Sequence, residues 1–159
     1  MDRIGREGRR AERVLTLLAS LSDVCDGGEI SELEHALQTA TRAELTGADD
    51  EVVLAALCYD IGKVFGDVGH GEISANLPKP HVRSELVFVV QHHGAFTARH
   101  WDLSLKAESD PRIQYRDQPW YALAEVFVDE WDMESFDPLY PRAELEHFAP
   151  LVRRLVTGA

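Results

Sequence analysis

Apolar residues recur with a helical period along most of the chain. They stand three and four positions apart at Val14, Leu18 and Leu21, which predicts a helix from about residue 9 to 21. A capping box that starts at Ser31 predicts a second helix running towards residue 45. No alternating strand pattern persists, so we expect an all-α fold of six or seven helices. The remaining helices are predicted over about 51–59, 72–76, 82–93, 120–133 and 143–156, and residues 97–118 form a mixed polar segment.

Composition and charge argue against some classes of binding partner. The 159 residues include 16 Lys+Arg and 28 Asp+Glu, and the formal net charge of -12 argues against nucleic acid or an anionic membrane as partner. A small-molecule substrate is expected, anionic ones included, because a metal ion can invert the local potential. The two cysteines form no metal-type pair, the first residues do not resemble a signal peptide, and no apolar run reaches membrane-spanning length. We therefore expect a cytoplasmic protein. The sequence does not indicate how many copies of the chain associate.

Two predicted helices end in polar residues where their apolar stripes would continue. Asp60 follows Val53 at i+7, and His93 follows Leu86 at i+7 with His92 beside it. A buried carboxylate must be paired, hydrogen-bonded or bound to a metal. Both a metal site and an ordinary hydrogen-bonded core are compatible with this pattern.

Three further residues have side chains of metal-ligand type. His35 lies on a polar face of the second predicted helix, His70 stands between two glycines, and Asp132 ends the helix predicted over 120–133. A carboxylate at the negative end of a helix dipole is unfavourable, and a metal ion would remove that objection. Asp129 is the rival for the role of Asp132. Each of these side chains could also simply be solvated.

Taken in chain order, these residues resemble the HD-domain superfamily of metal-dependent enzymes. The family pattern is H…HD…H…H…D on an all-α scaffold, and the resemblance covers about residues 31–132. It implies a single HD-like domain over residues 1–159. The motifs that carry it are EHALQTA around His35, YDIGK at 59–63, GHGE around His70, VVQHHG with His92 and His93, and EWD ending at Asp132.

Within the superfamily, HALQTA followed by DIGKV is most similar to the branch of myo-inositol oxygenase and the phosphonate-cleaving HD oxygenases. Those enzymes use a di-iron centre and O2 to cleave a C–C or C–P bond, whereas larger branches are phosphohydrolases. The resemblance implies iron, mono- or dinuclear, with Mn or another divalent metal as the alternative. The implied ligand set is Asp60 bridging two metals, His35 and Asp132 on one of them, and His70 with His92 or His93 on the other.

The sequence departs from the family pattern at Tyr59, which stands where the histidine of the HD pair is expected. Three interpretations are open: a phenolate ligand, an occupant of the first metal position that leaves a one-metal site, or a mark of a degenerate relative. The loop before His35 lacks the Tyr-x-Gly-Glu sequence of the phosphonate-cleaving oxygenases, so Tyr59 could instead fill an open metal position. By resemblance, Lys63 and Glu29 are substrate contacts.

The function expected from the resemblance is a non-haem iron oxygenase that cleaves a small polar substrate, a polyol or a phosphonate-like molecule. One alternative is a metal-dependent phosphohydrolase that acts on a phosphoester or nucleotide. The other is a degenerate HD domain with a binding or regulatory role.

Overall fold

Seven α-helices make up most of the protein in the computed structural model, which describes residues 3–158. Over this range there is no strand, and the predicted all-α class is confirmed. Residues 1–2 and 159, the ends of the predicted domain span, lie outside the described residues. The helices are α1 (Arg3–Ser20), α2 (Glu32–Leu45), α3 (Asp50–Cys58), α4 (His70–Ala75), α5 (Ser84–Trp101), α6 (Tyr121–Val126) and α7 (Leu145–Thr157). Between them lie 3-10 turns at Leu21–Asp23, Ile61–Phe65, Ala107–Ser109 and Pro111–Tyr115, and a π-helical turn at Phe127–Asp132.

Side-chain caps set the starts of the two central helices. The Ser31 hydroxyl accepts a hydrogen bond from the Glu34 amide, and the Glu34 carboxylate accepts one from the Ser31 amide at 2.8 Å, which confirms the predicted capping box. At the start of α3, the Asp49 carboxylate accepts a hydrogen bond from the Val52 amide at 3.1 Å. These caps fix where each helix begins along the chain.

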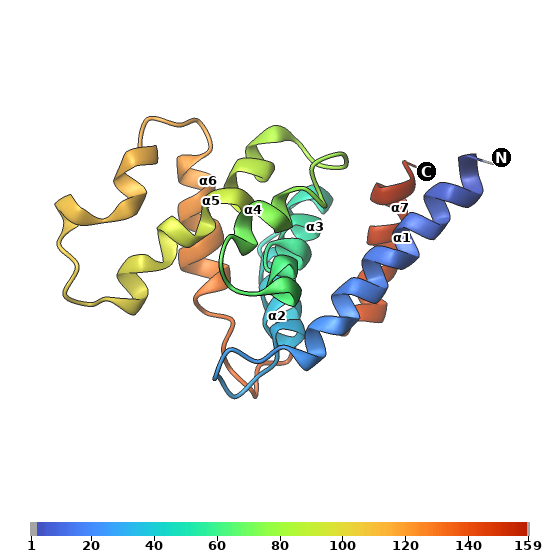
Figure 1. The fold of residues 1–159 in the computed structure, drawn as a ribbon, viewed down its shortest axis with the longest axis horizontal. Helices are drawn as coiled ribbons and strands as arrows, with labels where there is room; N and C mark the ends of the chain where they lie inside the picture. The colour runs from blue at the N-terminus through green and yellow to red at the C-terminus, as the bar shows by residue number, and fades with distance from the viewer. Residues whose placement is uncertain (1–2, 159) are drawn as a thin grey trace.

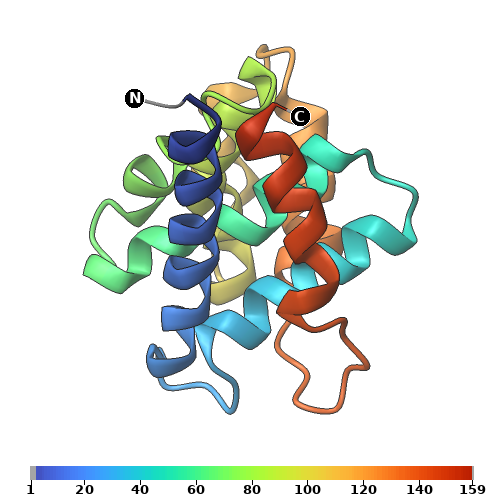
Figure 2. The ribbon, with the colours of Figure 1, turned by 90° about the vertical axis from the view of Figure 1, so that its right-hand side faces the viewer.

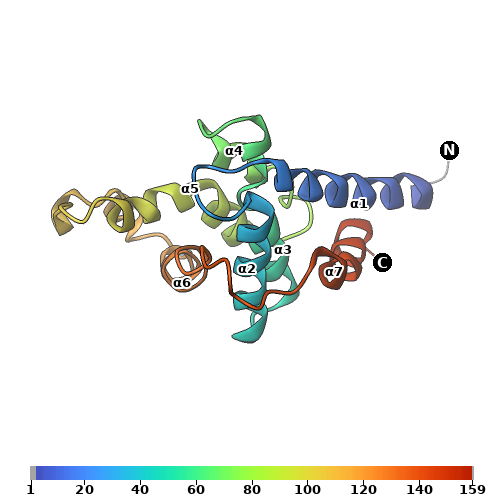
Figure 3. The same cartoon turned by 90° about the horizontal axis from the view of Figure 1, so that it is seen from below.

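Helix α3 is the centre of the core. Every residue from Val52 to Cys58 is buried, so this helix has no polar face and must be covered on all sides. Helices α2, α5 and α7 contact it. Figures 1 and 3 show α2 and α3 in the middle of the molecule, with α1 and α7 towards one end and α5 and α6 towards the other. The residue that follows α3 therefore enters the interior rather than the surface.

Helices α1 and α7 form a pair that covers one end of the core. They run side by side, as Figure 2 shows, and each contributes a buried apolar stripe that includes Leu18 on α1 and Val152 on α7. Among the described helices, none combines the length and the apolar character needed to cross a membrane.

The helix predicted to stop near His93 continues through Gly94 to Trp101. A glycine inside a helix costs about 1 kcal/mol relative to alanine, which made it a plausible end point. Two residues beyond it, however, Phe96 is fully buried, and the burial of this ring more than offsets that cost. The extra turns bring Thr97 and Trp101 into one helix with His93.

A buried guanidinium fixes the polar segment that follows α5. Arg112 is 2% exposed and donates two hydrogen bonds to the Asp129 carboxylate, at 2.9 and 3.0 Å, and another to the Phe96 carbonyl. Burial would raise the pKa of Asp129, but hydrogen bonds from Arg112 and His100 outweigh it and lower this pKa to about 2. The hydrogen bonds of Arg112 thus join residues 107–115 to α5 and to the π-helical turn.

We expect Arg112→Ala to lower the free energy of unfolding by about 2–3 kcal/mol, because it leaves Asp129 partly buried without its main partner. Urea unfolding followed by circular dichroism measures the change. Arg116→Ala is the matched control, since Arg116 is exposed and its acidic neighbour Asp117 is 4.0 Å away. The control should change stability by less than about 0.5 kcal/mol, and equal effects of the two variants would contradict this role.

Candidate metal centre

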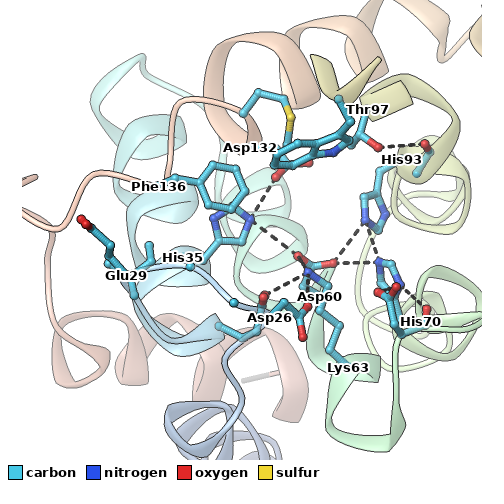
Figure 4. A pocket seen from close by; sticks show the side chains of 18 residues that line it. Asp26, Glu29, His35, Asp60, Lys63, His70, His93, Thr97, Asp132 and Phe136 are labelled. Atoms are coloured by element: carbon cyan, nitrogen blue, oxygen red, sulfur yellow. Dashed lines mark hydrogen bonds and ion pairs between the residues drawn. The ribbon is translucent and has the colours of Figure 1, made fainter. Parts of the chain in front are cut away.

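The carboxylate of Asp60 is the centre of the site. Asp60 follows α3, precedes the 3-10 turn Ile61–Phe65, and is 2% exposed. Its Oδ1 lies 3.0 Å from His70 Nε2 and 3.2 Å from His93 Nε2, while its Oδ2 lies 3.2 Å from Lys63 Nζ and 3.6 Å from His35 Nε2. Figure 4 shows these side chains pointing towards one another. Burial would raise the pKa of Asp60, but His70, His93 and Lys63 hold it well below its usual value.

All three histidines around Asp60 are oriented in the same way. Their Nδ1 atoms lie 2.7 to 2.8 Å from backbone carbonyl oxygens, those of Ser135 for His35, Asp67 for His70 and Val90 for His93. A carbonyl oxygen only accepts hydrogen bonds, so each Nδ1 carries a proton, and whenever the ring is neutral its lone pair is on Nε2. This is the arrangement found in histidines that bind metal ions through Nε2.

With both rings neutral, the atoms that meet on one side of Asp60 are all acceptors. His70 Nε2 lies 3.1 Å from His93 Nε2, and the buried Asp60 Oδ1 between them has no hydrogen-bond donor. Protons on both Nε2 atoms would place two positive rings in contact, whereas one cation satisfies all three atoms. Two ligand atoms that each lie about 2.1 Å from a metal ion, at right angles to one another, are about 3.0 Å apart. The spacing of the three atoms around Asp60 therefore fits a transition-metal ion. Asp60, His70 and His93 form one of the candidate metal groups of the described residues, and Glu32, His35 and Asp60 form another.

The other side of Asp60 holds a second cluster, centred on Tyr59. The Tyr59 hydroxyl lies 2.5 Å from His35 Nε2 and 2.8 Å from Asp132 Oδ1, and these two atoms are 3.0 Å apart. Burial, followed by the charges of Asp132 and Asp60, raises the pKa of Tyr59 well above its usual value. Burial alone would lower the pKa of His35, but Asp132 and Asp60 raise it to about 9. The phenol thus stays protonated and closes a hydrogen-bonded cluster.

Lys63 is held by three carboxylates. Its Nζ lies 3.1 Å from Glu32, 3.2 Å from Asp60 and 3.3 Å from Asp26. Burial would lower the pKa of Lys63, but Asp60 and Glu32 raise it above its usual value. The ammonium therefore places a fixed positive charge on Asp60 Oδ2.

A cavity of about 710 Å³ opens beside the two clusters. The metal-ligand types His35, Asp60, His70, His93 and Asp132 line it, as do Lys63 and Glu29. Tyr59 is fully buried and is not among the lining residues, although its hydroxyl contacts two that are. The rest of the lining comes from the loop before α2, from α5 and from the segment after Asp132.

The structure distinguishes the two adjacent histidines of α5. Of the adjacent histidines, His93 joins the cluster, whereas the His92 ring stacks on Trp120 and its Nδ1 lies 3.1 Å from the Tyr115 hydroxyl. Successive side chains of a helix point in different directions, so only one of the two can face Asp60. His92 is therefore not brought into the site.

Asp132, and not Asp129, faces His35. In an α-helix, residues three apart share a face, but here the chain passes through a π-helical turn at Phe127–Asp132 that turns the two carboxylates apart. Asp129 binds Arg112, Arg99 and His100, whereas Asp132 contacts the Tyr59 cluster.

Sequence reasoning missed several residues of the site. Glu32 precedes His35 by three positions on α2 and so shares its face. This spacing could have identified it, but Glu32 lies next to the capping residue Ser31 and looked like an ordinary acid of the first helical turn. Asp26 completes the contacts of Lys63. Phe136 stacks on the His35 ring, with 4.2 Å between ring centroids, and no periodic pattern in the loop around it indicated this contact.

Comparison with known proteins gives one distant relative. No family model matches the chain. The chain is similar to (1-hydroxy-2-(trimethylamino)ethyl)phosphonate dioxygenase (glycine-betaine-forming) of Leisingera caerulea, at 26% identity in an alignment 161 positions long. The alignment covers 82% of this chain and 81% of that enzyme. This weak similarity to an oxygenase suggests enzymatic activity.

Close contact between Gly62 and α4 sets the position of His70. The Gly62 amide donates a hydrogen bond to the Ser74 hydroxyl at 2.9 Å, and a Cβ at Gly62 would collide with the His70 carbonyl oxygen. We expect Gly62→Ala to displace His70 and to weaken Mn²⁺ binding by about tenfold or more, as measured by calorimetry.

Gly94→Ala is the matched control for Gly62→Ala. Gly94 adjoins His93, but a Cβ there meets no atom within 4 Å, so Mn²⁺ affinity should stay unchanged. Circular dichroism of both variants verifies that the helices form. Equal affinities of Gly62→Ala and the parent protein would show that this contact does not position the site.

Proposed function

We propose that this chain is a metal-dependent oxygenase with a single HD-type domain, and that it oxidises a small polar molecule bound in the cavity beside Asp60. The observation that carries the proposal is the meeting of His70 Nε2, His93 Nε2 and Asp60 Oδ1, which in the presence of neutral rings are three acceptor atoms with no donor among them. The distant similarity to a phosphonate dioxygenase supports oxygenase chemistry over hydrolysis.

The residues of the site fit a metal with mixed nitrogen and oxygen ligands. Neutral imidazole and carboxylate suit iron or manganese, and a bound redox-active ion of this kind would supply O2 activation. The chain's own contribution is positional. Backbone carbonyls hold His70 and His93 with Nε2 towards Asp60, and Lys63 fixes the orientation of the Asp60 carboxylate. Phe136 and Met133 line the cavity beside the cluster.

We further propose that one ion is bound, by Asp60, His70 and His93. A second ion between His35 and Asp132 would compete with the Tyr59 hydroxyl, which lies within 2.8 Å of the ligand atoms of both. The Asp60 oxygen that would bridge to such an ion is bound to the Lys63 ammonium. Of the three interpretations of Tyr59, these contacts support the one in which the tyrosine occupies the first metal position.

The metal content of two variants tests the single-ion proposal. Calorimetric titration with Mn²⁺ should give one ion per chain for the parent protein, and Tyr59→Phe should leave that number unchanged. Tyr59→His adds a nitrogen ligand beside His35 and Asp132, so a second Mn²⁺ should bind. Two ions in the parent protein would overturn the single-ion proposal and leave the oxygenase proposal standing.

Adjacent histidines provide a matched test of the oxygenase proposal. With anaerobically loaded Fe²⁺ and a panel of small amines, polyols and phosphonates, we expect O2 uptake that depends on one member of the panel. His93→Ala should lower it at least 100-fold, and His92→Ala, which alters the contact with Tyr115, should lower it less than about fivefold.

Hydrolysis is the outcome that would contradict this proposal. Release of phosphate from aryl phosphates or nucleotides, stimulated by Mn²⁺ and independent of O2, would identify a phosphohydrolase instead.

A further inference from the structure

Four arginines of α1 lie on one exposed face of that helix. They stand three, four and seven positions apart, a spacing that places side chains side by side on a helix surface. The buried apolar stripe of α1 packs towards α7, and Figure 2 shows these two helices side by side at one end of the molecule. The four exposed residues, called here the arginine stripe, are Arg6, Arg9, Arg10 and Arg13.

The arginine stripe is unpaired, although the chain has many more acids than bases. Among the described residues, no carboxylate forms an ion pair with any of its four arginines, whereas the whole chain holds 28 Asp+Glu and 16 Lys+Arg. Every arginine from Arg42 onwards, by contrast, contacts a carboxylate or an aromatic ring. The acids of this protein thus neutralise its other arginines and leave the stripe available.

The position of the stripe disfavours its own helix. Arg6 repels Arg10, and Arg9 repels Arg13, because like charges four residues apart destabilise a helix. The first turn of α1 holds no acidic residue, and positive charges near the N-terminus oppose the helix dipole. These charges therefore do not stabilise the fold, and a negatively charged partner would compensate them.

A surface cavity of about 630 Å³ adjoins the stripe at Arg10. It lies between α1, the segment 80–83 and the end of α7, and Pro80, Val82 and Leu155 give it apolar walls. It shares no lining residue with the cavity beside Asp60. A segment bound along the stripe could therefore place one side chain in this hollow.

The charges of the hollow nearly cancel. Glu51 accepts hydrogen bonds from the amide and the guanidinium of Arg83, and Glu7 lines the hollow together with Arg10. Burial, followed by the charge of Arg10, lowers the pKa of His81, so this ring is neutral at neutral pH. The hollow thus suits an uncharged side chain, whereas carboxylates belong on the stripe.

The size of the stripe favours a short acidic segment over a nucleic acid or a membrane. Residues 6–13 span about 10 Å along the helix axis. A duplex or a bilayer would extend over the rest of the chain, which holds all but two of the glutamates and aspartates and repels polyanions. A short acidic segment can place its carboxylates on the stripe alone.

We propose that the arginine stripe is a docking surface for an acidic segment of a partner protein, and that the adjoining hollow receives an uncharged apolar side chain of that segment. The carboxylates of the segment would pair with arginines that have no acidic partner among the described residues. Because this surface and the cavity beside Asp60 have no residue in common, the partner can bind whether or not the chain is an oxygenase.

Fluorescence anisotropy of a labelled heptapeptide, with glutamates on both sides of a central leucine, tests this proposal. The peptide should bind the parent protein, and its counterpart with glutamine in place of every glutamate should not. Affinity should fall about threefold or more between about 50 and about 200 mM NaCl, because exposed ion pairs are screened by salt. Glycine in place of the leucine should weaken binding about threefold or more, since the hollow then stays empty.

Two double variants locate the binding surface. Arg9→Gln combined with Arg13→Gln should lower peptide affinity about fivefold or more, because each exposed ion pair contributes up to about fivefold. Lys106→Gln combined with Arg116→Gln removes the same charge from exposed positions outside α1, and should change affinity less than about twofold. The thermal unfolding midpoint of the stripe variant should not fall, because the substitutions remove repulsion within α1.

Several results would overturn the proposal. They are equal losses of affinity in the two double variants, binding that does not depend on salt, and no binding at millimolar peptide. A lower unfolding midpoint of the stripe variant would assign these arginines to the fold instead. Tighter binding of polyuridine RNA or of phosphatidylserine vesicles would identify another class of partner. Equal affinities of the leucine and glycine peptides would exclude the role of the hollow.

Discussion

A buried carboxylate without enough hydrogen-bond donors organises this protein. Asp60 follows α3, whose residues are all buried from Val52 onwards, and it is itself 2% exposed at the wall of the cavity. A charge in such a place is very costly unless cations surround it. Lys63 meets one oxygen, and imidazoles that present lone pairs meet the other. In the proposed function, a cation joins those lone pairs and completes the electrostatic balance of the core.

The groups around Asp60 come from segments far apart in the chain. His35 belongs to α2, His70 to α4 and His93 to α5, and each ring is oriented by a carbonyl from a different part of the backbone. Movement of any one of these elements would therefore misplace a ring. Binding of the proposed cation would be coupled to packing of the core, and it should stabilise the folded state by mass action.

The sequence predicts the local features of this arrangement better than its long-range contacts. The capping box at Ser31 involves neighbours in the chain and is confirmed. The apolar stripe that leads to Asp60 also marked that residue for burial. The choice between His92 and His93 depends on which partner helix lies opposite, which periodicity cannot specify. The extension of α5 past Gly94 depends on burial of Phe96, and the contact of Phe136 with His35 depends on a loop.

The wide turn at Phe127–Asp132 has a broader consequence. It lets one short stretch of chain serve two separate tasks, since Asp129 anchors a neighbouring segment through Arg112 and Asp132 faces the Tyr59 cluster. A turn with one additional residue rotates everything after it while leaving the helix before it unchanged. During evolution, the insertion or loss of a single residue here could redirect a carboxylate from a scaffold contact to the cavity wall without rebuilding the surrounding helices.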